Sequence, residues 1–290
     1  STGLRGDKGL SDLIDFTSPG SFRNNTVTVL LNSNSLLTSA TGKWWDNGIS
    51  INDSGGVLSS SKTIYLITSG ANIATDYRMN VVDKVALITK PGVMKSTSFA
   101  TQMILISNNF VWVEGNYNNG STGPVINSGT SSKFNMFRNL KILSANSPAI
   151  VNSAITSSMF HNIFGLSTNF TFINFNNPKN ILSNITSSNT GGAGISVANP
   201  DNILLNTVVT NPLTIGIATS IGNIDTYSNN IFLNTTVANM ASTSGNGGID
   251  LGGGTSFGQL RNTFLNTIST NTGNSPSYAV KEANASLTKF

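Results

Sequence analysis

A short motif that recurs along the second half of the chain is the feature that most limits its fold. Its form is Asn-x-(Phe or Leu)-x-Asn, with one Ser in place of the first Asn. Its last residues are Asn139, Asn162, Asn184, Asn206, Asn234 and Asn266, at intervals of 23, 22, 22, 28 and 32 residues. A unit of this length is too small to fold alone. The repeat therefore predicts a solenoid, in which each unit packs on its neighbours.

The apolar positions of the motif indicate a bend at each of these asparagines. A Phe or Leu stands two residues before the asparagine, as at Leu182, and an Ile, Leu or Thr follows it, as at Ile185. Residues three apart on a straight strand point to opposite faces, so both reach one core only if the chain turns between them. Asn tolerates the left-handed backbone that such a turn requires. Each unit is predicted to be a strand, an Asn corner and a second strand, with successive Asn amides hydrogen-bonded in a ladder.

This pattern resembles the right-handed parallel β-helix of the pectin-lyase-like superfamily, which includes pectate lyases, phage tailspikes and many bacterial surface proteins. The likeness covers about residues 62–280, and segments 86–88, 103–106 and 110–113 look like earlier rungs without the motif. The resemblance implies an all-β fold, a single-stranded right-handed parallel β-helix of about nine or ten coils. A leucine-rich repeat is the competing solenoid, but the leucines of its longer consensus are missing.

Both ends of such a stack need cover, because the last rung exposes an open sheet edge. Residues 1–61 are predicted to form an N-terminal cap segment, in which Leu10, Leu13 and Ile14 are spaced for one face of a helix. Residues 62–290 are predicted to form the parallel β-helix with a C-terminal cap, for which segment 279–287 is the candidate.

Composition limits the chemistry. Of 290 residues, 113 are Asn, Ser or Thr and 10% are charged, with a net charge of +4 and no basic cluster, so no nucleic-acid partner is expected. The chain has no Cys, which excludes disulfides and Cys-ligated zinc, and no run of 18 apolar residues to span a membrane. No cofactor and no metal are expected. The composition favours an extracellular or cell-surface protein, for which an oligomer is possible.

The resemblance also implies what polysaccharide cleavage would require. Lyases of the superfamily use Asp residues of adjacent rungs to hold calcium, with an Arg or Lys as base, and its hydrolases use two or three carboxylates in one groove. The acids of the motif half are Asp201, Asp225 and Asp250, at different distances from the corner asparagines. We interpret them as solvated loop residues. The alternative is a site with Lys179 or Arg261 as base.

Three other residues bear on a candidate site. His161 is the only histidine and is predicted to point outward, as a surface residue without an acidic partner beside it in sequence. Trp44 and Trp45 are the predicted carbohydrate-binding residues, because an exposed aromatic ring can stack on a sugar. The alternative for these two rings is that they pack the cap onto the first rung.

The scarcity of acids favours a secreted or cell-surface β-helix protein without catalytic activity. Such a protein would bind glycans or extracellular matrix, or serve a structural role at the surface, and no catalytic residue is assigned. The alternative function is a polysaccharide lyase or hydrolase, of the pectate-lyase or tailspike type.

Overall fold

The computed structural model of the chain consists of strands and turns. It describes residues 47–51, 56–60, 63–70, 76–79, 85–90, 92–97, 100–128, 131–144, 146, 148, 150–152, 155–167, 169, 171–175, 177–188, 191–197, 199, 201–210, 212, 214–219, 229–240, 247–251, 263–271 and 278–282. This part of the chain contains no helix, and therefore none that could cross a membrane.

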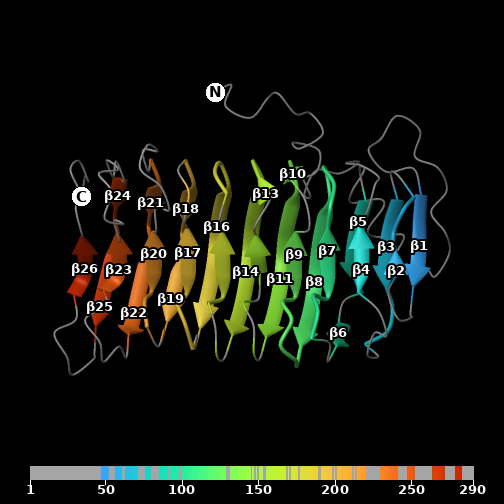
Figure 1. The fold of residues 1–290 in the computed structure, drawn as a ribbon, viewed down its shortest axis with the longest axis horizontal. Coiled ribbons are helices and arrows are strands. Elements are labelled where there is room, and N and C mark those ends of the chain that lie inside the picture. The colour runs from blue at the N-terminus through green and yellow to red at the C-terminus, as the bar shows by residue number, and fades with distance from the viewer. Residues whose placement is uncertain are drawn as a thin grey trace.

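The strands form two long parallel sheets and a short third one. Within each sheet the strands stack along a single axis (Figure 1). The first sheet runs through β1 (Asn47–Ile51), β3 (Thr63–Ile67), β5 (Val85–Thr89), β8 (Trp112–Asn119), β11 (Met136–Ser144), β14 (Met159–Ser167), β16 (Ile181–Ser188), β18 (Ile203–Leu205), β21 (Ile231–Leu233) and β24 (Thr263–Leu265). It also includes β6 (Met94–Thr97), β19 (Val208–Thr210), β22 (Thr236–Met240) and β25 (Ile268–Asn271).

The second sheet runs through β2 (Gly56–Val57), β4 (Tyr77–Met79), β7 (Ile104–Ile106), β9 (Ile126–Ser128), β12 (Ile150–Asn152), β15 (Ile173–Phe175), β17 (Ile195–Val197), β20 (Ile217–Thr219), β23 (Gly247–Leu251) and β26 (Tyr278–Glu282). The third pairs β10 (Ser132–Lys133) with β13 (Ile155–Thr156). Every pairing among the described strands is parallel and joins successive coils, for example β14 with β16 and β15 with β17. The predicted parallel β-solenoid is confirmed, and the second sheet contains ten strands.

The corner asparagines adopt the left-handed backbone that their positions predict. Their φ angles lie between 48° and 54° at Asn139, Asn162, Asn184, Asn206, Asn234 and Asn266. The Nδ2 group of Asn162 donates to Oδ1 of Asn139 at 2.7 Å, and Asn206 donates to Asn184 at 3.2 Å. Equivalent bonds join Asn234 to Asn206 and Asn266 to Asn234. Side-chain bonds thus join the corners at these four steps of the stack.

The first asparagine of the motif has a structural role that the sequence interpretation did not assign. Asn180, Asn202 and Asn230 are buried. The Oδ1 atom of Asn202 accepts a hydrogen bond from the backbone N–H of Asn180 at 2.9 Å, and Asn230 accepts one from Asn202 at the same distance. These amides satisfy backbone donors at an interior corner, where an unpaired N–H would be costly.

The position two before each corner faces the core, as predicted, and so does the position after it at Leu140, Ile163 and Ile185. The residues two before the corner are at most 4% exposed: Phe137, Phe160, Leu182, Leu204, Phe232 and Phe264. The rings of Phe137 and Phe160 stack at 4.5 Å, and those of Phe232 and Phe264 at 4.6 Å. Across the core, the second sheet contributes a row of fully buried isoleucines: Ile104, Ile126, Ile150, Ile173, Ile195, Ile217 and Ile249.

The two ends of the stack are described only in part. Strand β1 already pairs with β3, so the stack begins before residue 62, whereas residues 1–46, with the predicted helix around Leu10, lie outside the described residues. Because the predicted cap helix lies in those residues, the division at residue 61 stays a prediction. At the other end, β26 pairs with β23, so residues 279–282 of the candidate cap belong to the stack itself.

Candidate functional site

One row of side chains on the outer face of the first sheet brings together groups capable of acid–base chemistry. The strand register pairs Arg138 of β11 with Glu114 of β8 on one side and with His161 of β14 on the other. The same row continues through Ser183 of β16 and Leu205 of β18. Paired residues on neighbouring parallel strands lie about 4.8 Å apart, so these side chains are close neighbours.

These residues point outward because their neighbours in sequence point inward. Phe137 and Phe160 are fully buried, and successive strand residues face opposite sides of a sheet. Arg138 and His161 are half-buried. The predicted outward orientation of His161 is therefore confirmed.

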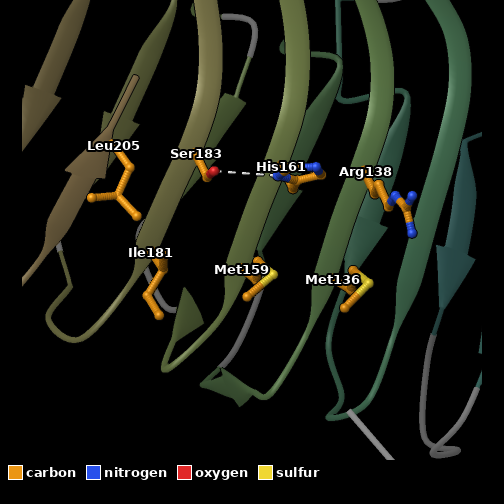
Figure 2. Close-up of a pocket in the computed structure, with 7 residues that line it drawn as sticks. All are labelled: Met136, Arg138, Met159, His161, Ile181, Ser183 and Leu205. Atoms are coloured by element: carbon orange, nitrogen blue, oxygen red, sulfur yellow. Dashed lines mark hydrogen bonds between the residues drawn. The ribbon is translucent and has the colours of Figure 1, made fainter. Parts of the chain in front are cut away.

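The row forms one side of a groove of about 300 Å³. Its lining consists of Met136, Arg138, Met159, His161, Ile181, Ser183 and Leu205. Figure 2 shows the lining as two parallel rows, with the polar groups in one and Met136, Met159 and Ile181 in the other. The groove thus places one cation and one imidazole beside an apolar floor.

His161 is held in its neutral form by its surroundings. Burial lowers the pKa of its imidazole below the usual 6.5, and the positive charge of Arg138 lowers it further. The Nδ1 atom lies 3.3 Å from Oγ of Ser183 (Figure 2). A contact at Nδ1 orients the ring and leaves the other ring nitrogen for a ligand. Neutral imidazole is the form that accepts a proton.

Arg138 is a half-buried cation. Burial lowers the pKa of its guanidinium to about 10, while the nearby charge of Glu114 acts in the opposite direction. The Oε1 atom of Glu114 accepts a hydrogen bond from Nδ2 of the corner residue Asn139 at 3.0 Å. At neutral pH, Arg138 remains charged and can pair with a carboxylate of a ligand.

The structure also locates the carboxylates considered from sequence. Asp201 is exposed at a corner before β18, and Asp250 lies in β23 of the second sheet. These two residues are therefore on different parts of each coil and do not form one column. Asp225 lies outside the described residues. Among the residues that are described, no three His, Cys, Asp or Glu side chains are grouped to hold a metal ion.

Trp44 and Trp45 also lie outside the described residues, so their role in carbohydrate binding stays a prediction. Arg138 was not singled out from sequence, although the signal was present. Arg138, His161 and Ser183 each directly precede a corner asparagine, so aligning the repeats places them in one row. Glu114 could not be found in this way, because its coil lacks the motif.

Comparisons with known proteins give similarity in fold only. No family model matches the chain, and no curated protein matches it. Among solved structures, a GH87 α-1,3-glucanase catalytic domain in complex with tetrasaccharides is 14% identical, with 82% of this chain and 58% of that domain covered and a TM-score of 0.34. The chain thus spans little more than half of that domain.

Two further solved structures are similar. The alginate lyase from Paenibacillus sp. str. FPU-7 is 9% identical, with 84% of this chain and 99% of the lyase covered and a TM-score of 0.42. The periplasmic alginate epimerase AlgG is 10% identical, with 84% and 85% covered and a TM-score of 0.27.

The prediction of a non-catalytic protein is wrong by these findings. The solved structures named above are a glucanase, an alginate lyase and an epimerase, and what they share with this chain is the fold. The prediction depended on the scarcity of acids at Asp201, Asp225 and Asp250. The register of neighbouring coils instead brings together His161, which can take up a proton, and Arg138, which can bind a carboxylate.

Proposed function

We propose that this chain is a polysaccharide lyase that cleaves a uronate-containing polysaccharide by β-elimination in the outer groove. The observation that carries the proposal is the pairing of His161 with Arg138 at the same register position of β14 and β11. A neutral imidazole beside a guanidinium is suited to a substrate that carries a carboxylate next to an acidic C–H bond.

In this reaction His161 removes the proton from the ring carbon beside the sugar carboxylate. Arg138 pairs with that carboxylate and stabilises the negative charge that develops on it as the C–H bond breaks. The electron pair forms a carbon–carbon double bond, and the glycosidic oxygen on the next carbon leaves. The leaving oxygen takes up a proton, supplied by the imidazolium of His161. One chain end is thus unsaturated, and no water is consumed.

The groove suits elimination better than hydrolysis. Glycoside hydrolysis requires two carboxyl groups about 5 to 9.5 Å apart across the scissile bond. The described residues that line this groove include no carboxyl group. Glu114 borders the row, and its Oε1 already accepts a hydrogen bond from Asn139. A uronate polymer is an extracellular material, so the proposal includes a location outside the cytoplasm.

The test is to incubate the protein with alginate, with polygalacturonate and with an uncharged β-glucan. The ultraviolet absorbance of unsaturated uronate measures elimination, and the release of reducing ends without absorbance measures hydrolysis. We expect elimination of at least one polyuronate. His161→Gln should lower its rate roughly 100-fold or more, since it removes the base.

Arg138→Gln should lower the rate by a similar factor, since it removes the partner of the carboxylate. Lys141→Gln is the matched control, because Lys141 is an exposed cation on the same strand, beyond the corner. Hydrolysis of the glucan, or elimination that survives in His161→Gln, would contradict the proposal.

A further inference from the structure

A second column of corners borders the groove, and we call it the corner ridge. It consists of Phe110, Phe134, Ser157, Lys179 and Asp201, all with φ between 51° and 64°. Each stands directly before a residue whose backbone N–H bonds to the coil above: Val111 to Asn135, for example, and Ser158 to Asn180. These bonds align the ridge along the axis of the stack.

Two ridge positions hold phenylalanine, which is unfavourable there because of the backbone conformation and because of the exposure of the ring. A bulky residue at positive φ is a conformational outlier, and other coils place Ser, Lys or Asp at this corner. Phe134 is also 37% exposed. Its ring stacks on that of Phe110, with centroids 5.5 Å apart and planes inclined by 21°. Strain combined with aromatic exposure is typical of positions kept for binding.

The stacked pair leaves one aromatic face for a ligand. Phe110 covers one face of Phe134, while the next ridge position on the other side is Ser157, whose side chain is far smaller than a ring. Two exposed cations lie nearby in the chain: Lys133 directly precedes Phe134, and Lys179 is the ridge residue after Ser157. A sugar ring that continues the stack would therefore lie between the coil that carries Lys133 and the coil that carries Lys179.

The ridge is close to the groove. Phe134 stands two residues before Met136, and Lys179 two before Ile181, and both of these apolar residues line the groove. Two residues of extended chain span at most about 7 Å. A polymer bound in the groove can therefore reach the ridge with a neighbouring sugar.

We propose that Phe134, backed by Phe110, is a stacking subsite for an acidic sugar ring, whose carboxylate pairs with Lys133 or Lys179. This inference rests on the proposed function, because it takes its ligand class from the lyase substrate. The apolar face of the pyranose packs on the phenyl ring, and the carboxylate replaces water around the ammonium groups. The subsite binds and positions the polymer and takes no part in proton transfer.

The test measures binding and stability in the same variants. On the His161→Gln background, calorimetry gives the Kd of purified oligogalacturonate and oligoalginate, with an uncharged cello-oligosaccharide for comparison. Phe134→Asn should weaken binding of an oligouronate roughly 3- to 10-fold. Because Asn tolerates positive φ, the same change should leave the melting temperature unchanged or raised. A residue with only a structural role would not separate the two quantities in this way.

Phe164→Ala is the matched control, since Phe164 is a 47% exposed phenylalanine of β14 beyond the Asn corner. It should leave the Kd unchanged. Unaltered binding in Phe134→Asn, or no binding of any oligouronate, would overturn the subsite. Binding that depends on Phe134 in a protein that cleaves nothing supports the subsite and refutes the lyase. Cleavage with an unchanged KM in Phe134→Asn supports the lyase and refutes the subsite.

Discussion

Arg138 of β11 and His161 of β14 occupy paired positions on adjoining coils, with both side chains on the outer face of the first sheet. The pairing has two consequences. The guanidinium charge adds to burial in lowering the pKa of the imidazole, which keeps His161 neutral. It also places a carboxylate-binding group within one strand spacing of a base. Two residues 23 positions apart in sequence thus lie side by side on the groove.

The pH dependence of polyuronate elimination follows from this pair. The rate should rise with pH on an acidic limb below pH 6.5, because the lowered pKa of His161 makes the imidazole neutral there. It should fall on an alkaline limb near pH 10, where Arg138 loses its charge. Measurement of kcat/KM across this range checks both limbs.

Arg138→Gln provides an independent check on the cause of the acidic limb. Loss of the guanidinium should move that limb toward pH 6.5 without reaching it, since burial is the larger cause of the lowered pKa. An acidic limb above pH 6.5 in the parent protein would show that another group is the base.

Leu182→Ala should lower the free energy of unfolding by about 2–5 kcal/mol, because Leu182 is fully buried between the equivalent residues of adjoining coils. Leu205→Ala is the control, since Leu205 faces outward in the groove and is only partly buried. Denaturant unfolding of both variants measures the difference. An equal loss of unfolding free energy in the two variants would show that the inward-facing residues of the motif are not the core.

Asn184→Ala should cost about 1–2 kcal/mol, because alanine must adopt a φ of 54° and the bond from Asn206 is lost. Asn184→Gly loses the same side-chain bond without the steric cost of a Cβ atom at positive φ. The glycine variant should therefore be the more stable of the two by thermal melting. The reverse order would contradict the corner geometry.

Gly165→Ala should destabilise the protein by about 1–3 kcal/mol through overpacking. A Cβ atom at Gly165 would collide with the ring of Phe172, which is fully buried and cannot move outward without exposing itself. Gly120→Ala is the control, because its Cβ atom would lie 3.7 Å from the carbonyl oxygen of Thr97, an ordinary contact. Chemical denaturation should separate the two variants, and similar midpoints would contradict the packing argument.

Much of the fold could be predicted because the motif is local. The inward side of Phe160, the turn at Asn162 and the outward side of His161 all follow from strand alternation and from the backbone preference of Asn. Those rules act within a few residues, so they hold whatever the rest of the chain does. The role of the first asparagine, as at Asn202, could not be predicted from such rules, because the backbone N–H that it binds belongs to another coil.

Lateral neighbours depend on how many residues each coil contains. The repeat intervals vary from 22 to 32 residues, while the paired strands keep their register from coil to coil. The register beside β8, in contrast, shifts between Arg138 and Leu140, so that Arg138 pairs with Glu114 while Leu140 pairs with Gly115. No local pattern records such a shift, since it arises from the fit of one coil on the next.

The sequence by itself determined that the chain winds into stacked strands with Asn corners, and which side of each strand is buried. Spacing and alternation are properties of the chain alone, and stereochemistry converts them directly into inside and outside. Only the tertiary structure decided that Glu114 joins the row of Arg138 and His161, and that Phe110 stacks on Phe134 beside their groove. These relationships are set by packing between coils, because the stacking free energy of whole rungs selects the register that no single segment specifies.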